Sequence, residues 1–453
     1  MSNFKVGYSI LNANPKLGTP LCGYYIHRYA SGFVNDLTVS TVAVNKDDKT
    51  IAIISIDHCI CSTNILDRII SSVSSKTNLT KDDLFISLTH THTGPGYNLD
   101  YDSEEEKKAT DEYYDFLISR VTDSVILAIN DLKDAKMGYI YGYAPERVAF
   151  IRRYMMKDGI AFTCPPIDDP NIDYPLGTLD QRVNVLRFDR KDAPTVVIVN
   201  YGIHADTVNG DLVSSDFIGF LRETVEKALD GVQTMFLGGA NGDVGSTNVH
   251  PTKGDMNDTE ISFDNEMKSP GMARFIGRAL AGTVLQVYDK VHYVDVDDID
   301  FVVKNFKVPS NMPTPEQLPT AKLYTKLHAE GRDDEIPFKA MQLTTAIAEA
   351  KRMCKLENGP EFFDMWLTGV KIGPVALVGI PGEPFTDIGV RIKEAEGWNL
   401  ILPCCLVNGS LGYFPTKSAY DEGGYEACGC KFKAGVDDVI VNNAIELLNG
   451  LRK

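Results

Sequence analysis

Histidine side chains follow two apolar segments of this sequence, at points where each segment runs into a polar turn. His90 and His92 lie two residues apart in THTHTGPG, directly after the apolar run LFISL, and His204 follows the run TVVIVNYG. Alternate residues of an extended strand point to one side, so His90 and His92 can reach one cavity. A histidine within an apolar run is costly unless its ring is bonded. We therefore interpret these histidines as candidate metal ligands, with a hydrogen-bonded core histidine as the alternative for His204.

A carboxylate and several tyrosines occupy similar positions later in the chain. Glu383 comes just after the apolar run PVALVGI, where we favour a ligand over an ordinary solvated glutamate. Tyr413, Tyr420 and Tyr425 follow the run NLILPCCLV, where a tyrosine taken alone is more often a packing residue. Two or three histidines with one carboxylate match a catalytic zinc site, which keeps an open position for water. Zinc lowers the pKa of that water to about 7, so the set predicts metal-assisted hydrolysis.

Two further polar segments leave alternatives open. The segment GANGDVGSTN carries Asn241, Asp243, Ser246 and Asn248, and it favours an oxyanion or nucleophile turn over a phosphate cradle because no GxxxxGK pattern is present. In SIDHCICS, Asp57 and His58 could supply a second metal or could pack beneath the first, and we favour packing. We expect one zinc ion per chain.

The elements that must position these residues alternate along the chain. Unbroken apolar runs predict strands covered on both faces, and helical patterns lie between them. We expect an α/β fold: a mixed, largely buried sheet with flanking helices and the metal site at the carboxyl ends of the strands. The predicted strands are Thr50–Asp57, Asp83–His92, Thr195–His204, Thr234–Ala240, Pro374–Pro381 and Asn399–Val407, and the predicted helices are Asp111–Asn130, Asp216–Asp230, Pro270–Tyr288 and Asp387–Glu396.

The remaining segments fit this alternation less well. Residues 293–309 indicate a lone strand, and about 310–358 indicate an inserted helical hairpin, which could also be a lid or a dimer arm. We expect residues 1–453 to form one catalytic domain.

Composition excludes several partners. The 453 residues carry a formal charge of −17, which opposes binding to nucleic acid or to anionic membranes. No apolar window reaches the roughly 18 residues of a membrane span, and no secretory leader is visible. The nine cysteines lack CxxC spacing and fit reduced, buried thiols. We expect a cytoplasmic enzyme with a small-molecule substrate and no stable membrane association, while the oligomeric state is not indicated.

At these motifs the chain resembles the neutral ceramidases, in their N-terminal catalytic domain, over nearly its whole length. The matching segments occur in the same order in both and are ASGFVNDL, THTHTGPG, AFIRRY, IHADTVNGDLVSSDFIGF, GANGDVGSTN, IPGEPFTDIGVR and GYFPTKSAYDEGGYE. The resemblance implies one zinc bound by His90, His204, Glu383 and Tyr413. It also implies His92 beside the metal, Arg152 holding the polarised carbonyl, and Tyr425 bonded to the substrate.

The chain departs from the family pattern in two places. The family serine follows valine in GDVSPN, whereas here Gly245 stands in that place and Ser246 comes one residue later. Either Ser246 takes over the catalytic role of that serine or the serine function is absent. The sequence also ends at Lys453 without the C-terminal β-sandwich of members that work at membranes. We therefore expect a zinc-dependent amidase acting on the N-acyl group of a soluble small molecule. The alternatives are an esterase or lactonase, a zinc lyase or isomerase on a sugar acid, and a non-catalytic metal-binding relative.

Overall fold

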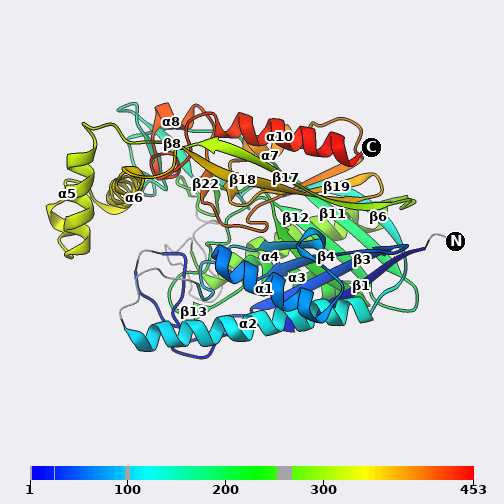
Figure 1. Cartoon of the computed structure of the whole chain (residues 1–453). Helices are drawn as coiled ribbons and strands as arrows, with labels where there is room; N and C mark the ends of the chain where they lie inside the picture. The colour runs from blue at the N-terminus through cyan, green and yellow to red at the C-terminus, as the bar shows by residue number, and fades with distance from the viewer. Residues whose placement is uncertain (1–2, 25, 97–102, 252–267, 453) are drawn as a thin grey trace.

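Two main sheets form the centre of the protein. The computed structural model describes residues 3–24, 26–96, 103–251 and 268–452 (Figure 1). The larger sheet has nine strands, in the order β14, β12, β11, β6, β1, β3, β4, β5, with β16 also paired to β6. The smaller sheet has the order β17, β18, β19, β21. The bounds of these strands are β1 Phe4–Asn12, β3 Thr38–Lys46, β4 Lys49–Ile56, β5 Leu84–Leu88, β6 Lys133–Tyr143, β11 Arg182–Arg190, β12 Thr195–Tyr201, β14 Val232–Gly238, β16 His292–Val294, β17 Ile299–Pro309, β18 Phe362–Ile372, β19 Val375–Gly379 and β21 Leu400–Cys404.

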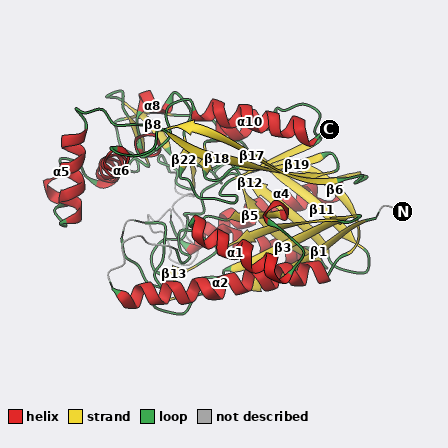
Figure 2. Ribbon diagram, viewed as in Figure 1, coloured by secondary structure: helices red, strands yellow, loops and turns green. Residues whose placement is uncertain are grey.

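The helices lie outside these sheets, so the described part of the chain forms four layers. Figure 2 shows the strands inside and most helices outside. The helices α1 and α2 pack on one half of the larger sheet, α3 and α4 on the other half, and α7 and α10 on the smaller sheet. The helix bounds are α1 Thr63–Lys76, α2 Glu104–Asn130, α3 Phe217–Ala228, α4 Pro270–Val287, α5 Leu318–Ala329, α6 Ala340–Leu356, α7 Thr386–Lys393, α8 Ala419–Glu422, α9 Tyr425–Cys428 and α10 Val436–Leu451.

The core between the two sheets explains the unbroken apolar runs. Phe85 and Leu186 of the larger sheet and Val370 and Leu402 of the smaller one belong to a single apolar cluster. Each such side chain contributes about 1.5–3 kcal/mol when it is fully buried. The expected mixed α/β fold with strands covered on both faces is confirmed. One face of each sheet is covered by helices and the other by the second sheet.

Three crossover units bring the polar segments to one end of the sheets. β4 and β5 pair in parallel, as do β12 and β14, and β19 and β21. Between the strands of these pairs lie α1, α3 and α7, respectively. Parallel strands joined by a helix have their carboxyl ends at the same edge, where ligands bind in open α/β sheets. The loops after these strands therefore meet.

Residues 293–309 do not form the predicted lone strand. They form the end of β16, which pairs with β6, and then β17, which pairs with β18 in the other sheet. Asp297 and Asp298 are exposed between the two strands and separate them. The segment predicted as an inserted helical hairpin contains α5 and α6, which pack through Leu327 and Ile347 and project at the left of Figure 1.

Short strands complete the end of the molecule where the loops meet. β8 pairs with β9 and β10, and three two-stranded sheets join β2 to β13, β7 to β15 and β20 to β22. Among the helices in the described ranges, none is long and apolar enough to cross a membrane. The bounds of the short strands are β2 Gly32–Phe33, β7 Phe150–Ile151, β8 Arg153–Met156, β9 Ala161–Thr163, β10 Ile172–Pro175, β13 Leu212–Val213, β15 Val244–Gly245, β20 Glu383–Pro384 and β22 Tyr413–Phe414.

Candidate active site

His90 and His92 reach the site from a turn and not from an extended strand. β5 ends at Leu88, and His90 has a φ of 65°, in the left-handed region. The His90 amide donates to the carbonyl of His58 at 2.9 Å, and the His92 amide donates to that of Ala205 at 3.0 Å. The two rings do lie side by side, nearly perpendicular to each other, with Nε2 atoms 3.2 Å apart. The i, i+2 argument therefore predicted the right neighbours for the wrong reason, because the strand ends before the pair.

Three buried donor atoms converge at the ends of different strands. His204 lies beyond β12, and Glu383 is the first residue of β20, beyond β19. His90 Nε2 lies 3.0 Å from His204 Nε2 and 3.1 Å from Glu383 Oε2, and His204 Nε2 lies 3.3 Å from the same oxygen. Each residue is at most 5% exposed. His90, His204 and Glu383 thus form one group that could hold a metal ion.

In each of the two histidines, Nδ1 contacts a backbone carbonyl oxygen outside the group, so that Nε2 faces the group. His90 Nδ1 lies 2.9 Å from the Cys59 carbonyl oxygen, and His204 Nδ1 lies 3.1 Å from that of Asn241. A carbonyl oxygen only accepts, so each Nδ1 carries the proton and each Nε2 keeps a lone pair. Two lone pairs and a carboxylate oxygen in mutual contact form a donor set that a metal ion could bind. Ligands at about 2.0–2.1 Å around tetrahedral zinc would lie roughly 3.3 Å apart, so the residues fit the ion.

Burial and neighbouring charges set the protonation states of these candidate ligands. Burial, together with Arg152 and the other histidines, holds the pKa of His204 well below its ordinary value, so its ring is neutral. Burial opposes ionisation of Glu383, but protonated His90 and Arg152 outweigh it and lower the pKa of the carboxyl group. Burial also opposes protonation of His90, but Glu383 outweighs it and raises the pKa of His90, so without a metal these two residues form an ion pair. Glu383 Oε2 accepts no hydrogen bond from any residue in the described ranges. A neutral imidazole beside an ionised carboxylate is the form that binds a metal, so a metal ion would displace the proton of His90.

The predicted fourth ligand and two predicted catalytic residues lie against this group. β22 pairs in parallel with β20, which places Tyr413 beside Glu383. The Tyr413 ring stacks near the His204 ring at 6.4 Å between centroids and meets the Tyr425 ring at 5.8 Å. The Arg152 guanidinium lies 5.4 Å from the Tyr413 ring centroid and forms an ion pair with buried Glu426 at 2.8 Å. Its Nη2 donates to the Gly242 carbonyl at 2.8 Å, so Arg152 is fixed in place.

Ser246 and Gly245 share a pocket with His204, one of the candidate ligands. This pocket of about 350 Å³ is lined by His204, Arg152, Gly245 and Ser246, among others. Ser246 is 4% exposed. A Cβ atom at Gly245 would lie 3.6 Å from the Cβ of Arg152, an ordinary contact, so the backbone has room for a serine there. Both positions are therefore close enough to the pocket to carry a hydroxyl group.

Close backbone approaches explain the glycines around Glu383. A Cβ at Gly242 would lie 2.6 Å from the carbonyl oxygen of Glu383, and one at Gly382 would lie 2.4 Å from that of Gly412. Neither distance can be tolerated without a backbone shift. Asp243 fixes the same junction, because its Oδ1 accepts from the amide and hydroxyl of Thr386 at 2.8 Å each. The glycine-rich turn thus packs against the Glu383 segment.

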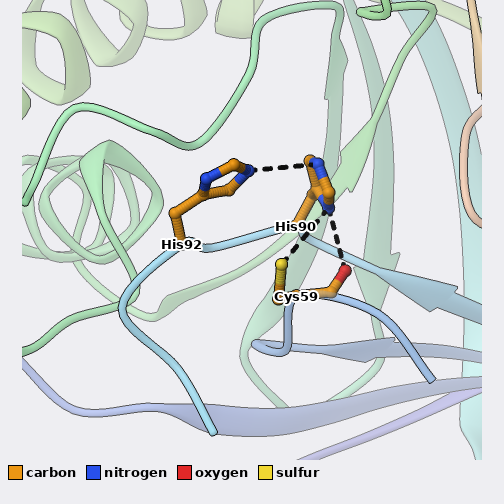
Figure 3. A group of neighbouring side chains, drawn as sticks. All are labelled: Cys59, His90 and His92. Carbon is orange, nitrogen blue, oxygen red and sulfur yellow. Dashed lines mark hydrogen bonds between the residues drawn. The ribbon is translucent and has the colours of Figure 1, made fainter. Parts of the chain in front are cut away.

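A second group of donors includes a cysteine that the sequence did not indicate. Cys59, His90 and His92 also lie close enough to hold a metal (Figure 3). His90 belongs to both groups, and its Nδ1, 3.8 Å from the Cys59 thiol, already donates to the Cys59 carbonyl. The thiol pKa is raised well above its ordinary value by its contact with Cys22 and by burial. The His90–His204–Glu383 group is therefore the better metal site.

Asp57 and His58 contact residues outside both groups of candidate metal ligands. Asp57 Oδ2 accepts from Arg222 at 2.8 Å and from the amide and hydroxyl of Thr38 at 2.9 Å each. The His58 ring stacks on Tyr114 at 5.6 Å. Neither residue belongs to a metal-binding group found in the described ranges.

Three charged residues around the site were not predicted. Asp206 and Lys268 line the pocket and form an ion pair, and Glu426 holds Arg152. Asp206 and Glu426 lie inside the quoted motifs, two residues after His204 and one after Tyr425, so their positions were an available signal. Lys268 lies outside every motif, and only the fold brings it to the pocket.

Comparison with known proteins identifies the family of the chain. The sequence profile of the neutral/alkaline non-lysosomal ceramidase N-terminal family matches residues 11–274. The fold is similar to a crystal structure of neutral ceramidase from Pseudomonas aeruginosa, with a TM-score of 0.73 and 16% identity, covering 100% of this chain and 75% of that one. A ceramidase complexed with C2 gives a TM-score of 0.70 and 15% identity over 100% and 76% of the two chains. No curated protein matches the chain. The chain belongs to the neutral/alkaline non-lysosomal ceramidase family and is a ceramidase-like hydrolase of amide bonds.

Proposed function

We propose that the chain hydrolyses the N-acyl amide bond of a small, soluble molecule and uses one zinc ion. The observation that carries this proposal is the contact among His90 Nε2, His204 Nε2 and Glu383 Oε2, at 3.0–3.3 Å, beside the pocket. Tyr413 is the fourth ligand in this proposal, because its ring stacks beside that of His204. Zinc held there would supply an activated water molecule at neutral pH and would polarise a carbonyl group.

The remaining site residues have separate roles in this proposal. Arg152 lines the pocket and is held by Gly242 and Glu426, so its remaining N–H groups can bind the carbonyl oxygen as negative charge develops. His92 lies beside His90 with its Nδ1 3.6 Å from Asp206, and it can transfer a proton to the leaving nitrogen. Tyr425, whose ring meets that of Tyr413, donates to the substrate. Ser246 assists from the pocket wall.

The size of the pocket supports a small substrate. Its volume of about 350 Å³ is at the lower end of the range of about 300–1,000 Å³ for ligand pockets. Its wall combines apolar and polar side chains, which suits a short acyl group attached to a polar part. Membership of a hydrolase family favours hydrolysis over the lyase, isomerase and non-catalytic alternatives. A cytoplasmic location stays a prediction from the sequence.

Metal analysis tests the proposed centre. We expect about one zinc per chain by mass spectrometry in the wild type and almost none in His90→Ala or Glu383→Gln. His292→Ala is the matched control, because His292 is exposed on β16. Zinc that persists in both ligand variants would refute the assignment.

Activity is tested on matched amide, ester and lactone substrates, with product masses recorded because hydrolysis adds water. We expect the amides to be cleaved fastest. Ser246→Ala should keep its zinc and lower kcat on the best amide about tenfold, a loss of about 1.4 kcal/mol of transition-state stabilisation. An unchanged kcat would show that Ser246 has no part in the reaction.

A further inference from the structure

The pocket beside the candidate metal ligands contains an ion pair to which the proposed reaction assigns no role. Lys268 Nζ donates to Asp206 Oδ2, and both side chains line the pocket. The Tyr24 hydroxyl donates to Asp206 Oδ1, and His92 Nδ1 lies 3.6 Å from that oxygen. Both oxygens of Asp206 therefore already face donors.

Lys268 is the more available member of this pair. Its side chain is 32% exposed and that of Asp206 is 19% exposed. In the part of the chain that the structure describes, Lys268 meets two oxygen acceptors, Asp206 and the Tyr24 hydroxyl at 3.5 Å. An ammonium group has three N–H donors, so one remains for a bound molecule.

The charges on the pocket wall favour an anion. Arg152 and Lys268 are two cations on this wall, and Asp206 is its one carboxylate among the described residues. Glu426, the partner of Arg152, is fully buried and does not line the pocket. Among the described residues of this wall, cations therefore outnumber carboxylates, whereas the whole chain carries −17.

The neutral lining fits the rest of such a molecule. Asn209 and Thr247 offer an amide and a hydroxyl group, while Pro165, Ile167 and Val249 provide an apolar wall. An acyl group could lie on this wall with its amide at the His204 end. The polar part of the molecule, on the other side of the amide, would then reach the ammonium group of Lys268.

We propose that Lys268 selects an N-acyl substrate that carries a carboxylate close to the scissile amide, as N-acyl amino acids do. This inference rests on the proposed amide hydrolysis and names the substrate class for the same site. Lys268 binds the carboxylate, and Asp206 positions the ammonium group through their ion pair.

The test compares N-hexanoylglycine with its uncharged analogue N-hexanoylglycinamide on the zinc-loaded enzyme. We expect kcat/KM at the hexanoyl amide to be at least tenfold higher for the acid. This ratio should fall to near one in Lys268→Met and should largely survive in Lys268→Arg. Lys227→Met, which removes an exposed lysine of another ion pair, should keep the wild-type ratio. A wild-type ratio near one, or an unchanged ratio in Lys268→Met, would overturn the inference.

A double variant separates direct binding from mere neutralisation of Asp206. In Lys268→Met with Asp206→Asn, the repelling carboxylate is removed together with the lysine. A ratio that stays near one supports contact between Lys268 and the substrate. Recovery of the wild-type ratio would show that Lys268 only neutralises Asp206, and the inference would then be wrong.

Binding decides the inference if neither compound is cleaved, an outcome that would count against the proposed hydrolysis for this substrate class. Titration calorimetry of the same two compounds with zinc-loaded protein then gives the ratio of their two binding affinities. Tighter binding of the acid that is lost in Lys268→Met supports the role of Lys268. Equal binding of both compounds to the wild type overturns it.

Discussion

At the scale of single residues, the two buried histidines near the start of the site differ in what their ring nitrogens contact. His90 has Cys59 on one side and the ligand group on the other. Both ring nitrogens of His58 lack a hydrogen-bond partner in the described ranges. Burial lowers the pKa of His58 to about 4. The two histidines follow the neighbouring strands β4 and β5, but only His90 reaches the candidate ligand group, whereas His58 packs as an aromatic ring.

His58 makes a pH-dependent contribution to stability. Its folded pKa of about 4 lies below the ordinary histidine value of 6.5, so the unfolded chain binds more protons between these values. The contribution is complete above about pH 6.5 and is lost as the pH falls toward 4, by on the order of 3 kcal/mol. Between pH 7.5 and 4.5, we expect the free energy of unfolding to fall less in His58→Phe than in the wild type, by about the contribution of His58. Urea unfolding at both pH values, with chelator in every sample so that zinc release does not contribute, checks this.

The comparison uses the change with pH, so any packing cost of the phenylalanine cancels. Parallel losses of stability in the two proteins would show that His58 does not titrate between its folded and unfolded states.

The site residues could be predicted from sequence where a motif places a donor after an apolar run. His90, His204 and Glu383 each satisfy that pattern, and they meet in the structure. Lys268 could not be found in this way, because it is 62 residues from Asp206 and follows no apolar run. A side chain that reaches a pocket from a distant part of the chain leaves no local pattern.

At the scale of elements, the turn after β14 controls the position of Glu383 without supplying a ligand. A Cβ at Gly242 would meet the Glu383 backbone at 2.6 Å, so Gly242→Ala must shift the Glu383 segment. We expect this variant to bind zinc at least tenfold more weakly, because donor positions must be accurate within about 0.5 Å. Competition with a chromogenic chelator measures the affinity.

Gly282→Ala is the matched control for this prediction. Gly282 lies in α4, and a Cβ there meets no atom within 4 Å. Alanine in a helix is favoured over glycine by roughly 1 kcal/mol, so the control should be as stable as the wild type or more so. Equal zinc affinity in both variants would show that the turn does not set the position of Glu383.

The limits of sequence reasoning about elements are visible at two segments. The helix expected from Asp111 begins at Glu104 and is capped by Ser103. Its first two turns are polar and carry no apolar period, so the hydrophobic pattern did not indicate them. The strand predicted over 293–309 proved to be two strands in different sheets. Apolar runs mark where strands occur, but they do not say which sheet each strand joins.

At the scale of the whole molecule, the candidate metal centre joins the two sheets. His90 and His204 follow β5 and β12 of the larger sheet, while Glu383 and Tyr413 follow β19 and β21 of the smaller one. The sheets also meet nearby, where the Asn408 side chain bonds the backbone of Ile86 and Leu84 at 2.9 and 3.0 Å. An ion in this place would link the sheets at one end of the core between them.

Removal of the metal should therefore loosen both sheets at that end. A ligand at about 100 times its Kd stabilises the folded state by about 2.7 kcal/mol, so a chelator should lower the Tm of the wild type. It should leave the Tm of Glu383→Gln unchanged. Hydrogen exchange should rise in the loops after β5, β12, β19 and β21 together. The α5–α6 hairpin, which contributes no ligand, serves as the internal control. Faster exchange after β5 and β12 alone would mean that the metal is held by one sheet and does not connect the two.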